Sequence, residues 1–163
     1  MPPETALSEI SAASRAAILA LNNAHAAELS WLEPAELSRL LDEAFHARRI
    51  GEVDAFLLAF DQDARYDSPN FEWFRARYPR FVYVDRVVVA EHARGRGYAR
   101  RLYADLFDHA ARSRYDLVTC EVNADPPNPA SDAFHAALGF TVAGQALIHG
   151  GSKSVRYFTR SLT

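Results

Sequence analysis

The alternation of apolar and polar residues predicts strands in the middle and second half of the chain. Three apolar runs rich in Val and aromatic residues, at Val53 to Phe60, Phe81 to Ala90 and Leu117 to Asn123, are typical of buried strands. From Tyr98 to Arg112, apolar residues recur every three or four positions, which predicts an amphipathic helix. Because a helix of this length joins the last two runs, we expect a right-handed crossover and two parallel neighbouring strands.

The first 50 residues are predicted to be mostly helical. A short strand is expected near Thr5 to Ile10, and apolar stripes predict helices at Ser14 to Leu21 and Pro34 to Phe45. Asn22 and Asn23 are expected to follow the first helix. They are interpreted either as polar residues at a helix end or as a wall of an acceptor pocket.

A polar loop at Asp61 to Asn70 follows the first apolar run, and residues 71–79 after it are dense in aromatic residues and arginine. A long loop before the central strand is a typical place for the mouth of a substrate site. Within it, Tyr66 and Asn70 are the candidate substrate contacts.

A further helix is predicted to begin at Pro129, with Asn128 as its N-cap, and its spacing places Ser131, Asp132 and His135 on one polar face. After this helix, the pattern predicts a β-hairpin that turns around two consecutive glycines. Its strands are Thr141 to His149 and Ser154 to Ser161.

Composition narrows the class of protein. With 163 residues, 49% of them hydrophobic, the chain is expected to form one domain over residues 1–163. The net charge of −3 does not favour nucleic acid, and no apolar run is long enough to cross a bilayer. Residues 1–10 lack the pattern of a secretory signal, and the lone Cys120 fits a reducing compartment. A cytoplasmic protein without nucleic-acid or membrane partners is therefore expected.

The segment Arg94-Gly95-Arg96-Gly97-Tyr98-Ala99 lies between the central strand and the long helix. The start of a helix has unpaired N–H groups and the positive end of the dipole, and glycines let an anion approach the backbone. Two arginines add charge, so the segment predicts a phosphate site. A P-loop would need Lys and Ser or Thr in place of Tyr98-Ala99, and a dinucleotide fingerprint would need a small residue at Arg100.

Two acidic residues lie inside apolar strands. Period-two alternation places Glu121 and Asn123 on one face of their strand, and Asp85 with Tyr83 and Val87 on one face of the central strand. Buried acids are unfavourable unless they are paired or functional. Pairing with a neighbouring arginine is the alternative explanation for either acid.

Arg94-x-x-Gly97-x-Ala99 resembles the acetyl-CoA pyrophosphate motif of the GNAT acetyltransferase superfamily. The second signature of that family is matched by Asn128, Ser131, Phe134, His135 and Leu138-Gly139-Phe140. The chain departs from the pattern at His135, where the family commonly has the tyrosine that protonates the departing thiolate. The resemblance covers residues 80–140. It implies an α/β fold with a mixed, centrally splayed sheet of six to seven strands flanked by about four helices.

The resemblance also implies cofactor contacts. Backbone amides of the central strand would hold the acetyl carbonyl and pantetheine, Asn128 the pantetheine arm, and Arg94 to Ala99 the pyrophosphate. The full set of expected cofactor contacts is Val87, Val88, Val89, Arg94, Gly95, Arg96, Gly97, Tyr98, Ala99, Asn123, Asn128, Ser131 and Phe134.

Transfer from a thioester to an amine needs a base for the ammonium and a donor for the thiolate. Glu121 is the first candidate base and Asp85 the second. His135 is the candidate acid, because histidine titrates near neutral pH. The expected function is N-acetyl transfer from acetyl-CoA to a primary amine of a small or amino-acid-like acceptor, with no metal and with a homodimer through the terminal hairpin as the suggested assembly.

Other classes fit less well. A Ser131/Asp132/His135 hydrolase would lack a nucleophile elbow, and Cys120 is expected to point into apolar packing, away from Glu121. The histidines show no tight metal-ligand spacing. The remaining alternative is a non-catalytic acyl-CoA-binding sensor or regulatory module with the same fold.

Overall fold

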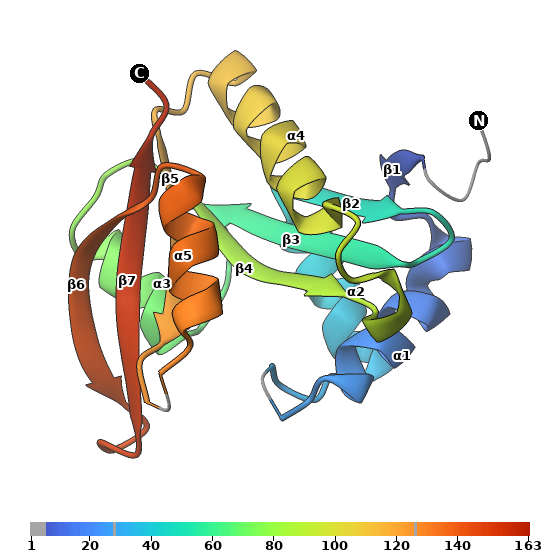
Figure 1. Cartoon of the computed structure of the whole chain (residues 1–163), viewed down its shortest axis with the longest axis horizontal. Helices are drawn as coiled ribbons and strands as arrows, with labels where there is room; N and C mark the ends of the chain where they lie inside the picture. Colours follow the sequence, from blue (N-terminus) through green and yellow to red (C-terminus); the bar gives the residue numbers. More distant parts are fainter. Residues whose placement is uncertain (1–5, 28, 126) are drawn as a thin grey trace.

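A seven-stranded sheet with the order β1-β2-β3-β4-β5-β7-β6 organises the computed structural model, which describes residues 6–27, 29–125 and 127–163 (Figure 1). Only the β4–β5 pair is parallel among the strand pairs of the described residues. The strands are β1 Leu7–Glu9, β2 His46–Ile50, β3 Ala55–Asp61, β4 Val82–Val89, β5 Leu117–Asn123, β6 Thr141–Ile148 and β7 Lys153–Ser161.

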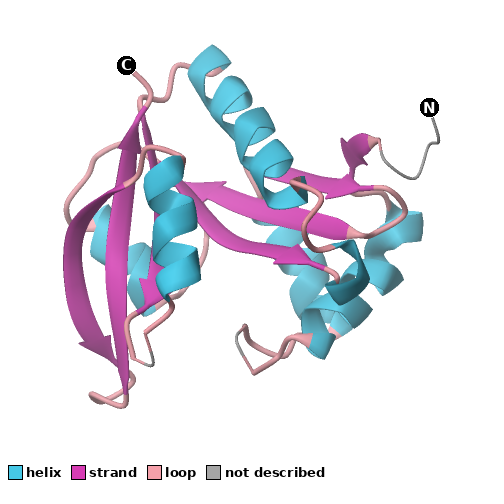
Figure 2. Cartoon of the chain, in the orientation of Figure 1, coloured by secondary structure: helices cyan, strands magenta, loops and turns pink. Residues whose placement is uncertain are grey.

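Helices cover both faces of the sheet (Figures 1 and 2). They are α1 Arg15–Ala24, α2 Pro34–Glu43, α3 Pro69–Arg75, α4 Tyr98–Arg112 and α5 Pro129–Ala137, with short 3-10 turns at Ala12–Ser14 and Glu91–Ala93. The predicted mixed α/β architecture is confirmed, with one helix more than the four expected in the part of the chain that is described. None of these helices is both long and apolar enough to span a bilayer.

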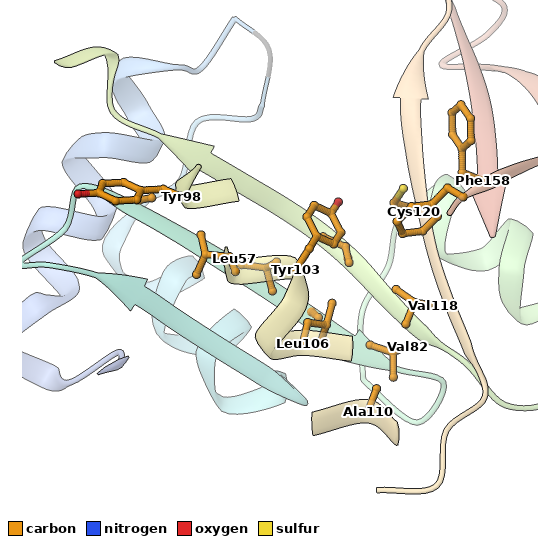
Figure 3. Close-up of a cluster of buried hydrophobic side chains, with 14 of the residues drawn as sticks. Leu57, Val82, Tyr98, Tyr103, Leu106, Ala110, Val118, Cys120 and Phe158 are labelled. Carbon is orange, nitrogen blue, oxygen red and sulfur yellow. The ribbon is translucent and has the colours of Figure 1, made fainter. Parts of the chain in front are cut away.

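Two apolar clusters hold the helices to the sheet. One lies between the sheet and α4, where Leu102, Tyr103 and Leu106 pack against β3, β4 and β5 (Figure 3). The other lies on the opposite face, where residues of α1, α2 and α3 pack against β3, β4 and β7. Cys120 belongs to the first cluster and is buried, which raises the pKa of its thiol and confirms the expected apolar environment.

The sheet divides between β4 and β5. These strands pair only at Val82 with Val118 and at Tyr83 with Thr119, near the start of each strand. Beyond these two pairs β4 has β3 as its only strand partner in the described residues, so its other edge presents backbone groups to the space in front of β5. The predicted parallel neighbours are thus confirmed, and their contact is short.

A β-bulge in β4 changes which residues share a face. Leu58 of β3 is opposite Arg86 and the next residue, Ala59, is opposite Val84, so Asp85 is the extra residue. Tyr83 consequently packs in the cluster on the α1–α3 side, whereas Val87 packs against the cluster below α4. The expectation that Val87 shares a face with Tyr83 is wrong, because strict alternation ends at the bulge.

The first half of the chain differs from the expectations at two places. Residues 46–50, for which no strand was predicted, form β2, since their pairing with β3 outweighs a polar sequence, His-Ala-Arg-Arg-Ile. Helix α1 continues through Ala24, so Asn22 and Asn23 lie within it. The short first strand is present as β1, while Thr5, its expected start, lies outside the described residues.

Candidate active site

The divided sheet leaves two adjoining pockets, and Glu121 of β5 lines both. The first, of about 320 Å³, is also lined by Tyr66, Asn70, Tyr83 and Asp85. The second, of about 200 Å³, lies towards α4 and α5 and shares several lining residues with the first. Its other polar lining residues are Tyr103, Asn123, Ser131 and His135. The structure therefore brings together most of the residues predicted for the chemistry.

The Glu121 carboxyl is held through one oxygen. Oε1 accepts hydrogen bonds from Asn70 Nδ2 at 3.0 Å and from Tyr83 Oη at 2.9 Å. Oε2 is buried and has no hydrogen-bond partner among the residues described. Burial, together with the Asp85 charge nearby, raises the pKa of Glu121 to about 8, despite the two donors on Oε1. The group can therefore exchange a proton near neutral pH.

Asn70 is oriented by a neighbour on the hairpin strand. Tyr157 Oη donates to Asn70 Oδ1 at 2.9 Å, so the amide nitrogen of Asn70 faces Glu121. The Tyr157 ring stacks on Trp73 of α3, with ring centroids 4.2 Å apart. Gly144 of β6 makes room for this indole, because a Cβ there would lie 2.6 Å from Trp73 Cζ2. α3 and the hairpin thus fix the donor to Glu121 from outside the pocket.

Asp85 already has partners. Its Oδ2 accepts from Arg86 Nε at 2.6 Å and its Oδ1 accepts from Tyr66 Oη at 2.5 Å. Arg86 is in turn hydrogen-bonded to Asn22 Oδ1 at 2.8 Å. Pairing with an arginine, the alternative explanation for a buried acid in this strand, therefore describes Asp85. Glu121, without any ion pair in the described residues, is the better placed of the two candidate bases.

Helix α5 turns His135 inwards. Its side chain is buried, whereas Ser131 and Asp132 are partly buried. Ser131 Oγ lies 3.4 Å from His135 Nδ1 and both residues line the second pocket, so this part of the expected polar face is turned towards the site and not towards solvent. His135 Nδ1 lies 2.7 Å from the Ser131 carbonyl oxygen, and Nε2 lies 3.3 Å from Tyr103 Oη. Since a carbonyl only accepts, we assign the proton of the neutral ring to Nδ1, and Nε2 accepts from Tyr103. Burial lowers the pKa of His135 and raises that of Tyr103.

The glycine-containing turn forms a third pocket, of about 370 Å³, in front of α4. Gly95 and Gly97 have φ values of +80° and +75°, and a Cβ on either would project into open space. Both residues are thus placed where only glycine keeps the backbone both unstrained and accessible. Phe134 of α5 lines the same pocket, so the two sequence signatures meet there.

A fourth pocket connects the turn to the Glu121 region. Val87, Val88, Val89 and Arg94 line it, from the edge of β4 that β5 leaves unpaired. It shares Val89 and Arg94 with the pocket at the turn, and Val87 with the pocket that contains His135. Three adjoining pockets therefore follow β4 from the glycine turn to Glu121, which is the shape required for a long phosphate-bearing ligand.

The asparagines among the predicted contacts differ in their surroundings. Asn123 lines the pocket with His135, whereas Asn128 uses its side chain to cap α5, accepting from Ser131 N at 3.1 Å. Asn22 and Asn23 bond to the backbone of Ser30 and Leu32 and so hold the loop between α1 and α2 beside the pocket. Neither of these two lines a pocket described here, so their position favours support of the rim over contact with substrate.

Sequence reasoning named Tyr66 and Tyr98 but missed the contacts of three other tyrosines. Tyr83 was expected to be near the acids, but its hydrogen bond to Glu121 was not foreseen, and Tyr103 was interpreted only as an apolar helix residue. Tyr157 and Lys153, from the terminal hairpin, were not considered for the site. Their approach depends on β7 pairing with β5, which inserts the last strand between β5 and β6. A tyrosine in the apolar stripe of a helix does not by itself indicate a functional role.

No group of three or more potential metal ligands is found among the described residues. The scattered histidines belong to separate environments: His46, for example, donates to Asp105 of α4 at 2.8 Å on the face remote from Glu121.

The geometry can be compared with known proteins. The family model of the acetyltransferase (GNAT) family matches residues 18–140. The chain therefore belongs to the GNAT acetyltransferase family, and the resemblance seen in its two signatures is confirmed. No curated protein matches the chain in sequence.

Solved structures agree in fold. The Salmonella typhimurium protein yncA, whose structure contains its cofactor acetyl-CoA, is 20% identical, with a TM-score of 0.71 over 97% of this chain and 94% of that one. The ribosomal-protein-S18-alanine N-acetyltransferase of Escherichia coli is 14% identical, with a TM-score of 0.70 and the same coverage. A ribosomal-protein-alanine N-acetyltransferase from Brucella melitensis is 19% identical, with a TM-score of 0.70 over 96% of this chain and 99% of that one.

The network around Glu121 generates a first prediction. Tyr83→Phe removes a hydrogen bond that favours the charged carboxylate, so the pKa of Glu121 is expected to rise above 8, by roughly one unit. The measurement is a pH titration of buried carboxyl signals by infrared difference spectroscopy, with Glu121→Gln to assign the band. Tyr115→Phe is the matched control, because its hydroxyl donates to Asp61 and contacts neither Glu121 nor Asn70. An unchanged titration in Tyr83→Phe would contradict the prediction.

Proposed function

We propose that the protein transfers the acetyl group of acetyl-CoA to a primary amine, with Glu121 as the base. The observation that carries this proposal is a carboxyl with one oxygen fixed by two donors and the other unpartnered, placed where the acceptor-side and cofactor-side pockets adjoin. Family membership supports the acyltransferase class. Direct transfer needs positioning and electrostatics and no covalent enzyme intermediate.

The residues of the chain fit coenzyme A. Gly95 and Gly97 leave the start of α4 open to a diphosphate, and the arginines of the turn add positive charge. Val87, Val88 and Val89 present the unpaired edge of β4 to the pantetheine arm and the acetyl carbonyl. Asn123, Ser131 and Phe134 line the facing wall. When bound, acetyl-CoA would supply the thioester from which the acetyl group is transferred.

Glu121 then handles the proton of the acceptor. An alkyl ammonium has a pKa of about 10, so it must lose a proton before attack. Oε2 of ionised Glu121 takes this proton, directly or through a water molecule, while Tyr83 and Asn70 keep Oε1 in place. A raised pKa makes the carboxylate a stronger base than an exposed glutamate would be. Asp85, neutralised by Arg86, serves instead to fix the bulge and Tyr66.

For the leaving sulfur, we propose Tyr103 as the hydrogen-bond donor. Its single hydroxyl proton, directed at His135 Nε2 in the free protein, would turn to the sulfur as negative charge develops there, so His135 positions the hydroxyl beforehand. Burial raises the pKa of Tyr103, whereas a thiol titrates near ~8.5, so complete proton transfer from this hydroxyl would be uphill. Neutral His135 offers Nε2 as an acceptor and has no second proton to give. This revises the sequence-based assignment of His135 as the acid.

The acceptor remains a small or amino-acid-like amine in this proposal. The first pocket, of about 320 Å³, has the volume of a small-molecule site, and hydroxyl, amide and charged groups line it. Similar folds include enzymes whose names give ribosomal-protein alanine as the target, so a protein N-terminus is the competing acceptor. A screen of free amines and short peptides, read by release of free thiol, separates the two.

Cofactor binding has a direct test. In Gly97→Ala, the new Cβ would enter the cradle at the turn and strain a residue with φ +75°, so coenzyme A is expected to bind at least about tenfold more weakly. Isothermal titration calorimetry measures the affinity. Gly150→Ala is the matched control: φ is +67° and space is equally open there, but the residue lies in the hairpin turn. Absence of any binding heat in the unmodified protein would exclude the cofactor assignment.

The role of Glu121 has a pH signature. Because the carboxylate is the active form, kcat/KM for amine acetylation is expected to rise with pH through about 8, the pKa of Glu121 in the free protein. Glu121→Gln should lower kcat by roughly 10²- to 10⁴-fold and remove this inflection, while the affinity for coenzyme A is retained. A variant with normal kcat would remove Glu121 from the mechanism; cofactor binding without transfer in the unmodified protein would favour the sensor alternative.

Tyr103 and His135 can be separated by a double-mutant cycle. Tyr103→Phe is expected to lower kcat about tenfold by removing the donor to the sulfur, and His135→Asn to lower it by no more than that. The double variant should resemble Tyr103→Phe alone, since one residue acts through the other. If His135→Asn abolishes transfer and Tyr103→Phe does not, His135 is the donor itself.

A further inference from the structure

We infer that Lys153 binds an anionic group of the acceptor, so that the substrate is an amine which also carries a carboxylate or a similar acid. This inference rests on the proposed function and specifies the acceptor side of the same site. It depends on the position of Lys153 and on the balance of charges around the pocket.

Lys153 is the only lysine in the chain and the first residue of β7. Its strand partner is Ile148, at the closed end of the β6–β7 hairpin. It lines both pockets that Glu121 lines, together with Ile148 and His149 in the first of them. The side chain is only half-buried, so the ammonium remains accessible at the rim. The hairpin therefore places one cation beside the entrance to the reacting centre.

The other charges of the first pocket are largely compensated. Asp85 is neutralised by Arg86 at 2.6 Å, and that arginine is also bonded to Asn22. Glu121, with a pKa of about 8, is mostly protonated at neutral pH before an acceptor binds. Lys153 has no carboxylate within ion-pair distance among the residues described. Asp67, at the end of the loop before α3, is the remaining acid of the lining and is exposed.

This arrangement discriminates between classes of amine. An acceptor that places its ammonium beside Glu121 can place an acidic group beside Lys153. The opposite charges of this acidic group and Lys153 then attract each other. A simple alkylamine has no acidic group and therefore gives Lys153 no counter-charge. A diamine brings a second cation towards Lys153 and is disfavoured by repulsion. The pocket therefore selects for opposite charges at the two ends of a short molecule.

The test compares acceptors of equal length within each variant. The probes are ω-amino acids with two to five methylenes, the alkylamines of the same length and the corresponding diamines, each assayed with acetyl-CoA by thiol release. The unmodified protein is expected to prefer the amino acids over the alkylamines by roughly tenfold in kcat/KM at the best length. Lys153→Ala should reduce this ratio to about one, and Lys153→Glu should move the preference to the diamine. Arg112→Ala, a cation on α4 outside every pocket described, is the control and should keep the original ratio.

Three results would overturn the inference: a preference for alkylamines or diamines in the unmodified protein, an amino-acid preference that survives in Lys153→Ala, or a loss of preference in Arg112→Ala as well.

Acetylation of no amine at all would instead count against the proposed function. In that case, calorimetry with the same amino acids in the presence of coenzyme A tests the anion site by itself. Weaker binding to Lys153→Ala than to the unmodified protein supports the anion site, and equal affinity excludes it.

Discussion

The short contact between β4 and β5 is the constraint on which the site depends. Two residue pairs join these strands, and past them the bulge at Asp85 turns β4 away while β5 continues along β7. A sheet normally satisfies every interior backbone group, so an interior strand with a free edge is a place where a ligand can complete the ladder. Other parts of the fold line the space beside this edge: Leu29 from the loop after α1, Tyr103 from α4, His135 from α5 and Lys153 from the hairpin.

Glu121 illustrates how such an opening supports chemistry. A carboxyl at this position is buried, and its charged form accepts hydrogen bonds through only one oxygen. The donors are not independent of the scaffold: Tyr83 sits on β4 itself, and Asn70 is oriented by Tyr157, whose ring is stacked on Trp73. The acidity of one side chain is thus set by elements that are more than 80 residues apart in the chain. Asp85, by contrast, gains a full ion pair and becomes part of the framework.

Much of this fold follows from local patterns in the sequence. The apolar runs of β3, β4 and β5, the stripe of α4, and the caps of α5 are each specified within a few residues, and the glycine turn predicts the cofactor end. β2 could not be predicted from its local pattern, because Arg48 and Arg49 interrupt the apolar residues. The strand is stabilised by its pairing with β3. The bulge at Asp85, the inward turn of His135 and the hydrogen bond of Tyr103 to His135 depend on contacts between elements distant in sequence. Alternation and helical spacing contain no information about these contacts.

The single lysine has a practical consequence. Because Lys153 is the only side-chain amine of the chain, an amine-reactive dye used under conditions that spare the N-terminus would attach at one known place, half-buried at the rim between the two pockets. A fluorophore there would sense ligands entering from either direction. The native chain could in this way report occupancy of its own site without any engineered cysteine, while its one thiol, Cys120, stays shielded in the core.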